Sequence, residues 1–240
     1  MIDRLSQHAF LSGPIQPASV VWDFGANQGE FCLAVAHKYG CRVLAAEPVP
    51  ELANALAGRS QLVTVLPKAV GGADTTVTFD YDLTKDKTGS MLGLEVVGGL
   101  LNESTTLKRV TVQMVSLETL FASTGAARVN LLKLDIEGAE LDLLLDSPAE
   151  LLQRCDQITV EFHDYWYPEL GERTEKAKTR LRSLGFHMIR FTPNNKDVLF
   201  VNLGTLPLSI TQRFWAGMVL RNFYGFGRML RVYSRKLVGG

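Results

Sequence analysis

Short apolar runs alternate with segments of helical periodicity in the N-terminal part of the chain. The runs at 20–24, 42–46 and 62–66 are rich in β-branched and other apolar residues and have the length of buried strands. Residues 29–38 and 50–56, which lie between these runs, carry apolar side chains at helical spacing. This order predicts parallel strands joined by right-handed helical crossovers.

The second half of the chain continues this pattern and then changes it. Two more buried strands, each followed by a helix, are predicted, with the strands at 130–134 and 157–162 and the helices at 138–145 and 172–184. Two short β runs at 186–191 and 198–203 follow with no helix between them, which indicates an antiparallel edge pair. We therefore predict an α/β fold whose mostly parallel sheet has an antiparallel closing strand and helices on both faces.

Two further β runs, 75–81 and 109–115, do not fit the strand–helix repeat. The first alternates apolar and polar residues, as a half-buried strand does. We expect the two runs to pair as an antiparallel insertion over the site, joined by a polar loop that begins at residue 82. Ser116 is predicted to cap a short helix, with Thr119 at the position that often holds Glu.

Three segments are predicted along the chain: an N-terminal arm at 1–19, the α/β domain at 20–205 and a basic C-terminal tail at 206–240. Residues 1–19 are expected to form a leading helix or arm, ended by Gly13-Pro14 and Pro17. The zero net charge hides an uneven distribution, because the residues from 208 onward contain six cations and no acid. The first 207 residues hold 19 cations against 25 acids, so an acidic body precedes a basic tail.

The tail combines arginines with aromatic residues. Arg221, Arg228 and Arg235 recur every seven residues and would share one face of a helix. This pattern predicts a basic amphipathic segment that contacts a membrane surface through 209–237. The alternative, given equal weight, is that the tail packs on the acidic body or on a second subunit of a homodimer. Nucleic acid is not favoured as a partner, since no recognition motif is present.

Cysteine usage and hydropathy indicate a reducing compartment. The three cysteines have unrelated spacings and form neither a disulfide framework nor a zinc motif. The N-terminal residues lack the apolar core of a signal peptide, and no run of about 18 apolar residues predicts a membrane span. We expect a cytoplasmic protein, peripheral at the membrane if the tail binds lipid.

A glycine-containing turn joins the first predicted strand to the first predicted helix. Gly25 and Gly29 bracket the turn, and the helix N-terminus that follows has unpaired N–H groups. The turn lacks the third glycine of a dinucleotide fingerprint and the lysine of a phosphate-binding loop. Asp23, at the strand end, would repel a pyrophosphate and suits a ligand with a cationic amino group. The alternative is that Asp23 and Asn27 only cap the helix.

Glu47 follows the second predicted strand, where a carboxylate could accept hydrogen bonds from a ribose diol. Alone, Glu47 could equally lie on a solvated turn. Carboxylates at two successive strand ends favour a bound ligand, because ligands of open α/β sheets bind at the carboxyl ends of the strands.

A second acidic turn follows the strand at 130–134 and contains Asp135, Glu137 and Glu140. The run Leu-Lys-Leu-Asp-Ile-Glu-Gly-Ala-Glu, with Asp-x-Gly-Ala-Asn-x-Gly upstream, resembles the FkbM family of S-adenosylmethionine (SAM)-dependent methyltransferases. The resemblance extends from Val20 to Leu203 and includes Val-Glu-Phe-His at 160–163. It implies a class I methyltransferase fold with a Rossmann-like sheet, and O-methylation of sugars, glycolipids, polyketides or related natural products.

The resemblance and the two turns together indicate the cofactor site. The residues expected to bind SAM are Asp23, Gly25, Asn27, Gly29, Glu47, Pro48, Lys68, Ala69 and Asp135. Lys68 and Ala69 lie in a turn that, by the resemblance, would lie against the adenine ring. The acceptor would be a small molecule or a glycan. Residues 165–167 (Tyr-Trp-Tyr) suit a wall on which a sugar ring stacks, or a loop packed on the body.

Methyl transfer to a hydroxyl requires an aligned acceptor and the removal of its proton. His163 is the candidate base, because imidazole titrates near physiological pH, and Asp135 and Glu137 are its rivals. These residues and Glu161 could instead hold a divalent ion that lowers the pKa of the acceptor hydroxyl. We favour the alternative in which Asp135 and Glu137 cap the next helix and contact the substrate, so no metal is predicted.

Two other functions compete with O-methylation. A non-catalytic SAM-binding scaffold on the same fold is the first, and the intact glycine turn with Glu47 argues against it. A nicotinamide-dependent oxidoreductase is the second, and the missing third glycine argues against that assignment.

Overall fold

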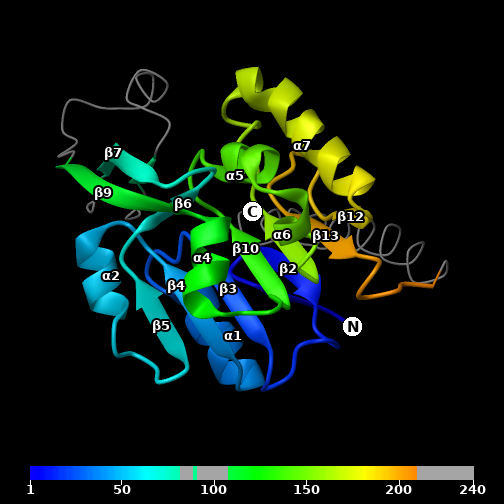
Figure 1. The fold of residues 1–240 in the computed structure, drawn as a ribbon, viewed down its shortest axis with the longest axis horizontal. Coiled ribbons are helices and arrows are strands. Elements are labelled where there is room, and N and C mark those ends of the chain that lie inside the picture. The colour runs from blue at the N-terminus through cyan, green and yellow to red at the C-terminus, as the bar shows by residue number, and fades with distance from the viewer. Residues whose placement is uncertain (82–88, 91–107, 210–240) are drawn as a thin grey trace, which may run out of the picture.

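The structure is a computed structural model that describes residues 1–81, 89–90 and 108–209 (Figure 1). Within them, a central sheet has the strand order β12-β13-β11-β10-β3-β4-β5. Its strands, in chain order, are β3 Val20–Phe24, β4 Arg42–Ala46, β5 Val63–Leu66, β10 Leu131–Leu134, β11 Gln157–Val160, β12 Phe186–Arg190 and β13 Val198–Asn202.

Five neighbouring strands of this sheet run parallel to one another, in the spatial order β11-β10-β3-β4-β5. β13 is antiparallel to both β11 and β12. The predicted mostly parallel sheet with an antiparallel closing strand is therefore confirmed. From β3 the chain first adds β4 and β5 on one side and then places β10 and β11 on the other. The order of strands reverses between β3 and β10, and this reversal opens a crevice at their carboxyl ends.

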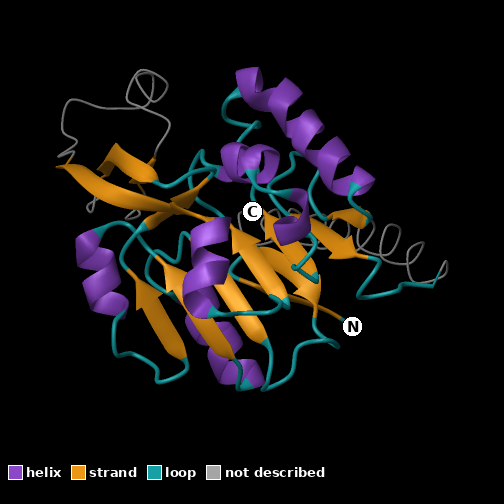
Figure 2. Cartoon of the chain, in the orientation of Figure 1, coloured by secondary structure: helices purple, strands orange, loops and turns teal. Residues whose placement is uncertain are grey.

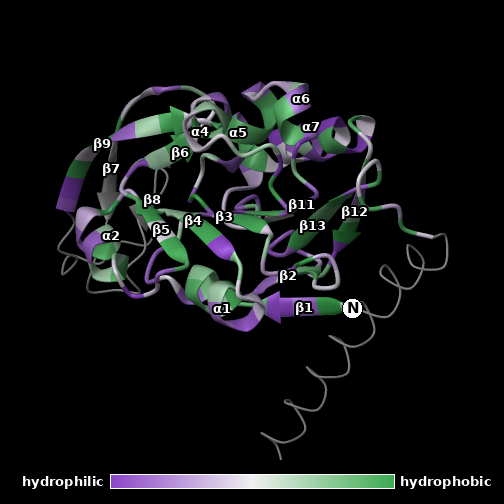
Figure 3. Cartoon of the chain, turned by 60° about the horizontal axis from the view of Figure 1, so that its bottom comes forward, coloured by the Kyte–Doolittle hydropathy of each residue, from purple (hydrophilic) through white to green (hydrophobic). Residues whose placement is uncertain are grey.

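Helices cover both faces of the sheet, as predicted (Figures 2 and 3). Their bounds are α1 Glu30–Tyr39, α2 Pro50–Leu56, α4 Leu117–Thr124, α5 Glu140–Asp146, α6 Ala149–Leu152 and α7 Gly171–Ser183, with a 3₁₀ turn η1 at Pro168–Leu170. Alternate residues of a strand point to opposite faces. Trp22 and Phe24 accordingly pack with the apolar side chains of α4 to α7, whereas Val21 packs with those of α1.

The N-terminal segment begins with a β-hairpin, so the leading helix that was one of its two predicted forms is wrong. β1 (Ile2–Leu5) pairs antiparallel with β2 (His8–Leu11) through a two-residue turn in which Ser6 and Gln7 both have positive φ. Turns of this kind are usually signalled by Asn or Gly, which are missing here. The Gln157 side chain holds the hairpin against the sheet, because it accepts from the Leu11 N–H (2.7 Å) and donates to the Leu11 carbonyl (3.1 Å).

A second, smaller sheet contains β6 (Ala69–Gly71), β7 (Thr75–Tyr81), β8 (Gly89–Ser90) and β9 (Lys108–Ser116) in the order β6-β9-β7-β8. β7 and β9 are antiparallel, which confirms their predicted pairing. The Ser116 side chain caps α4 by accepting from the Thr119 N–H (3.2 Å), also as predicted. Residues 69–71, expected to form part of a turn, are instead a short strand parallel to β9.

Smaller differences concern the helix after β10. It begins at Glu140 rather than at residue 138, because Glu137 and Gly138 have positive φ and cannot continue a right-handed helix. Leu141, Leu143 and Leu144 are its buried leucines, whereas Leu145, expected to face the sheet, is only partly buried.

Parts of two predicted features lie outside the described residues: the loop from residue 82 and the tail from residue 210. Among the described residues, no helix combines the length and the apolar character that crossing a bilayer requires.

Candidate functional site

The glycine turn after β3 lies directly against the turn after β10. Gly25 has φ +78°, and a Cβ on it would lie 1.7 Å from the backbone oxygen of Asp135. Gly29 has φ +83° and ends the turn at the start of α1. The N–H groups of Gly25 and Ala26 both donate to the Ala46 carbonyl at 3.0 Å, which fixes the turn to the end of β4. The glycines are therefore required by backbone conformation and by close approach.

Asp23 is fully buried and already paired. Its carboxylate lies 3.0 Å from the Lys133 ammonium and accepts from the Cys32 N–H at 3.1 Å. Lys133 also donates to the Gly25 carbonyl at 2.7 Å and lies 3.5 Å from the Asp135 carboxylate. Burial alone would lower the pKa of Lys133, but the charges of Asp23 and Asp135 outweigh it and raise that pKa, so the lysine stays cationic.

Lys133 therefore sits between the two acidic turns and neutralises charge in both. The predicted role of Asp23, attraction of a cationic amino group, must be reconsidered, because its charge is balanced inside the protein. That Asp23 helps to shape a cofactor site remains a prediction. The capping alternative holds in one respect: Asp23 accepts from the Cys32 N–H in the first turn of α1. The N-cap residue itself is Gly29, which has no side chain to cap the helix.

Glu47 points toward the glycine turn and away from bulk water. Its carboxylate accepts from the Asn27 N–H at 2.7 Å and from the Val49 N–H at 2.9 Å, and the residue is 4% exposed. Burial raises the pKa of Glu47, although both hydrogen bonds oppose that shift. The structure thus brings Glu47 and Asn27 together at the end of β4, whereas a solvated turn would have left them apart.

Other predicted cofactor residues lie along the same edge of the sheet. Pro48 follows Glu47 and is partly buried, as is Lys68 at the end of β5. Ala69 is buried at the start of β6. Their proposed contacts with SAM, including that of the 68–69 segment with adenine, stay predictions.

The second half of the site surrounds His163, just after β11. Its Nε2 lies 3.2 Å from a Glu137 oxygen and 4.0 Å from an Asp135 oxygen, and its Nδ1 lies 3.4 Å from a Glu140 oxygen. His163 is 7% exposed, whereas the side chain of Glu137 is 36% exposed. The three residues predicted to be catalytic, His163, Asp135 and Glu137, are therefore brought together.

The carboxylates determine the charge of His163. Burial alone would lower the pKa of His163, but the hydrogen bonds and charges of Glu137 and Glu140 raise it to about 11. Burial raises the pKa of Glu137, while His163 opposes that shift. The imidazole thus carries its proton at neutral pH in this arrangement. His163 as an isolated neutral base does not fit, and the His163–Glu137 pair has to be considered as a unit.

Asp135 and Glu137 do not cap the following helix, contrary to expectation. The N-cap residue of α5 is Ala139, whose side chain cannot accept a hydrogen bond from the helix backbone. Glu140 instead folds back to accept from the N–H groups of Ile136 (2.7 Å) and Gly138 (3.0 Å). This contact frees Asp135 and Glu137 from a capping role and holds the turn that presents them.

Sequence reasoning missed His8, Lys133 and the structural role of Glu140. Glu140 and Lys133 stand in the quoted motif, and a lysine inside an otherwise apolar strand is a signal of a buried partner. His8 gave no such signal. It is 2% exposed, and its Nε2 reaches to 3.5 Å from the Asp135 carboxylate because the N-terminal hairpin folds against β11.

The aromatic residues after His163 have mixed environments. The Tyr165 hydroxyl donates to Glu161 at 2.9 Å, and its ring is roughly parallel to that of His163 at a centroid distance of 6.2 Å. Trp166 is 60% exposed, which makes it one of the few large apolar side chains on the surface. A stacking wall for a sugar ring remains a prediction for this segment.

Comparisons with known proteins give a family for this arrangement. The profile described as "Methyltransferase FkbM domain" matches residues 23–188. Methyltransferase 1 of Beauveria bassiana is 29% identical over 191 residues, which cover 72% of this chain and 74% of that protein. AMB antimetabolite synthetase AmbE of Pseudomonas aeruginosa is 26% identical over 206 residues, which cover 72% of this chain. The matched region is only 10% of the length of AmbE.

Solved structures are more distant. A fibrillarin pre-rRNA processing protein of Methanococcus jannaschii has 12% identity and a TM-score of 0.43, covering 84% of this chain and 80% of its own. The N-terminal domain of human METTL16 in complex with SAH has 14% identity and a TM-score of 0.40, covering 77% of this chain and 61% of its own.

Proposed function

Because the chain belongs to the FkbM methyltransferase family, we propose that it transfers the methyl group of SAM to a hydroxyl of a sugar, glycolipid or polyketide-type acceptor. The fold is that of a class I methyltransferase, and the chain is a SAM-dependent methyltransferase by family. The hydroxyl acceptor and the roles of individual residues are the proposed part.

The edge formed by the turn after β3 and the end of β4 suits SAM. The turn brings backbone, rather than bulky side chains, to the crevice, and Glu47 presents a buried carboxylate of the kind that a ribose diol can donate to. Bound there, SAM would supply a methyl carbon activated by the sulfonium. Asp23 and Lys133 would contribute indirectly by fixing the turn, since Lys133 pairs with Asp23 and donates to the Gly25 carbonyl.

The observation that carries the acceptor proposal is the His163–Glu137 pair. It lies at the carboxyl ends of β10 and β11, across the strand reversal from the glycine turn. Glu137 is the more exposed member of the pair, and its backbone has φ +52°, a conformation that non-glycine residues seldom adopt. Such backbone strain tends to persist where function requires it.

We assign the two members different tasks. Glu137, on the open side, receives the proton that the acceptor hydroxyl loses, and His163 holds the Glu137 carboxylate in place through the 3.2 Å contact. Asp135, held by Lys133 at 3.5 Å, borders both the cofactor edge and the acceptor edge. A base at this position supports an oxygen acceptor, because a hydroxyl is a weak nucleophile until its proton is removed.

Calorimetry and product analysis test the two halves separately. Wild-type protein should bind SAM, and Glu47→Ala should bind it at least roughly tenfold more weakly, because the ribose diol would lose the carboxylate that accepts its hydrogen bonds. Glu118→Ala, at an exposed glutamate of α4, is the matched control and should bind normally. If wild type and Glu47→Ala bind SAM alike, the cofactor assignment is wrong.

The acceptor is tested by release of S-adenosylhomocysteine in the presence of pooled sugar, glycolipid and polyketide acceptors. His163→Ala should keep SAM binding and lose turnover. SAM binding without turnover on any acceptor would favour the competing function, a non-catalytic scaffold on the same fold.

The location of the protein is a further part of the proposal. We propose a cytoplasmic enzyme whose segment 209–237 reaches a membrane surface or a second subunit. Liposome co-sedimentation of the full chain and of a chain ending at Leu206 separates these possibilities. Equal pelleting of the two excludes a lipid-binding role for the tail.

A further inference from the structure

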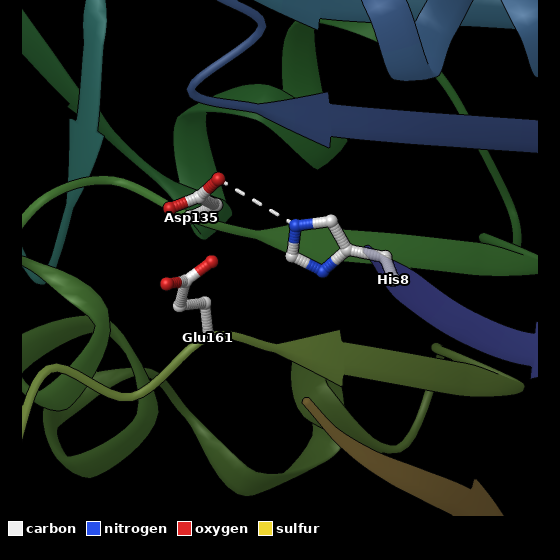
Figure 4. Close-up of side chains that lie close together, drawn as sticks. All are labelled: His8, Asp135 and Glu161. Carbon is white, nitrogen blue, oxygen red and sulfur yellow. Dashed lines mark ion pairs between the residues drawn. The ribbon is translucent and has the colours of Figure 1, made fainter. Parts of the chain in front are cut away.

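Three side chains from distant parts of the chain converge at the carboxyl ends of β10 and β11 (Figure 4). His8 comes from the N-terminal hairpin, Asp135 follows β10 and Glu161 follows β11. Each offers one ligand atom, and these atoms all lie within 4.8 Å of one another. The picture shows the imidazole and the two carboxylates pointing toward a common centre.

The spacing of these groups is unlike that of a direct hydrogen bond. The His8 Nε2 and the nearer Asp135 oxygen are 3.5 Å apart, longer than the 2.7–3.2 Å typical of such bonds. Two ligand atoms that each lie about 2.1 Å from one ion are about 3.0–3.4 Å apart in octahedral or tetrahedral geometry. Small rotations of the His8 and Asp135 side chains would therefore give this pair the separation of two ligands of one ion, and the ligand atom of Glu161 lies within 4.8 Å of both.

The position of His8 is the second observation. The residue is 2% exposed, and no hydrogen-bond partner of its Nδ1 lies among the described residues. The hairpin that carries it is fastened at both sides, since the Ala9 N–H donates to Asp197 at 3.1 Å and Leu11 exchanges two hydrogen bonds with Gln157. A buried histidine is thus held beside two carboxylates, with its Nε2 3.5 Å from the Asp135 oxygen that also lies 3.5 Å from the Lys133 ammonium, and with a Glu161 ligand atom within 4.8 Å.

We propose that His8, Asp135 and Glu161 bind a divalent transition-metal ion at the acceptor end of the sheet. Two carboxylates and one imidazole form a mixed oxygen and nitrogen set, which suits Mn²⁺ or Zn²⁺ better than Mg²⁺, an ion that prefers oxygen ligands. The site lies partly outside the family match, because His8 precedes residue 23. The sequence predicted no metal. The proposal differs because His8, for which the sequence predicted no role, lies beside Asp135.

A second group, Asp135, Glu140 and His163, also has metal-like spacing but is the poorer candidate. Both oxygens of Glu140 already accept backbone N–H groups, from Ile136 and Gly138. In the His8 group, the hydrogen bond from Tyr165 and the ion pair with Lys196 (3.4 Å) both involve Oε1 of Glu161. Neither contact uses the second oxygen of Glu161, whereas both oxygens of Glu140 are used. The two groups share Asp135, so one ion at a time is expected.

The role of the ion rests on the proposed function. An open coordination position would take the acceptor oxygen, orient it toward the methyl carbon and lower the pKa of the hydroxyl. The proton released would then pass to Glu137. The binding of the ion itself needs neither SAM nor acceptor.

Calorimetry on the full chain tests the site directly. Chelator-treated protein is titrated with Mn²⁺, and the loss of the electron paramagnetic resonance signal of free Mn²⁺ gives a second readout. We expect saturable binding, weakened at least about tenfold in His8→Ala and in Glu161→Gln. His37→Ala, at an exposed histidine on α1, should bind as wild type does, and so should His163→Ala.

Several results would overturn the proposal. One is the absence of saturable Mn²⁺ binding by the wild type, which would leave a buried His–Asp pair without a metal. Another is wild-type affinity in both His8→Ala and Glu161→Gln. Loss of binding in His163→Ala with retention in His8→Ala would move the site to the other group. Mg²⁺ binding as tight as that of Mn²⁺ would remove the imidazole from the ligand set.

Two features keep the test decisive. Should His8→Ala fail to fold, Glu161→Gln, which preserves side-chain shape, decides the matter. SAM affinity measured on the same samples separates this proposal from the proposed function. A wild type that binds SAM but not Mn²⁺ refutes only the metal site, and a wild type that binds Mn²⁺ but not SAM refutes only the cofactor assignment.

Discussion

The two acidic turns of the sheet differ in how their charges are satisfied. In the turn after β3, Asp23 is paired with Lys133 and Glu47 accepts two backbone N–H groups, so both carboxylates have partners inside the protein. Beyond β10 and β11, Asp135, Glu137 and Glu161 lie around two imidazoles; Asp135 and Glu137 are partly exposed, whereas Glu161 is buried. The first region is organised by backbone shape and is the one we propose to bind the cofactor, whereas the second holds the side chains to which we assign the chemistry.

Lys133 links these regions, so its removal should have the largest effect. Lys133→Met leaves Asp23 as a buried charge without a partner, and we expect a loss of about 3–5 kcal/mol in the free energy of unfolding. Urea denaturation measures it. The double variant Asp23→Asn/Lys133→Met should recover part of the loss, because the unpaired charge is gone. A loss under about 1 kcal/mol in the single variant would show that the pair is unimportant.

Gly25→Ala tests whether the glycine turn is shaped by contact with the second region. The new Cβ would overlap the Asp135 carbonyl at 1.7 Å, and φ is +78°, so we expect a loss of about 3 kcal/mol together with weaker SAM binding. Gly58→Ala is the matched control, with the same φ of +78° and nothing within 4 Å of the added Cβ. It should cost only about 1 kcal/mol. Equal losses in the two variants would contradict the close approach.

Glu137→Gln tests the chemical character of the second region. The amide keeps the shape of the side chain but cannot accept the proton, so turnover should fall about a hundredfold while SAM affinity stays the same. The assay is release of S-adenosylhomocysteine with an acceptor that the pooled-acceptor test identifies. Glu150→Gln, at an exposed position of α6, should have no effect. Undiminished turnover in Glu137→Gln would leave the second region without its proposed base.

Asp3→Asn should have the smallest effect and tests whether the hairpin that carries His8 depends on an ion pair. Burial alone would raise the pKa of Asp3, but hydrogen bonds from Lys38 and Tyr39 lower it below its ordinary value. A carboxylate with a lowered folded-state pKa stabilises above its unfolded pKa, near 3.9, and loses that contribution as the pH falls. The wild type should be more stable than Asp3→Asn by under about 1 kcal/mol at pH 7.

The pH series is the check on this prediction. Thermal melts from pH 7 down to pH 3 should show the difference between wild type and Asp3→Asn shrinking toward zero. A difference that grows as the pH falls would have the wrong sign.

Much of the fold could be predicted from local patterns. Runs such as Val20–Phe24 and Leu131–Leu134 are apolar enough to be buried strands, and Gly25 marks a turn that only glycine permits. Carboxylates placed directly after strands then indicated the edge at which the site forms. These features depend on neighbouring residues, so a single sequence contains them.

The predictions that were wrong or missing involve contacts between residues that are far apart in the sequence. The hairpin at 2–11 is stable because Gln157 and Asp197 hydrogen-bond its backbone, and its Ser6-Gln7 turn lacks the usual turn residues. No role was predicted for Lys133, whose register partner on the neighbouring strand is Asp23.

Family and fold class were therefore readable from residue order, because periodicity, turn chemistry and short motifs are local properties, and the site residues drawn from the same motifs stay predictions. The pairing of Asp23 with Lys133, the proton held on His163 and the arrival of His8 beside Asp135 were not, because each depends on which segments the folded chain brings within a few ångströms. Electrostatic interactions between buried groups depend steeply on distance and burial, and both are set by packing.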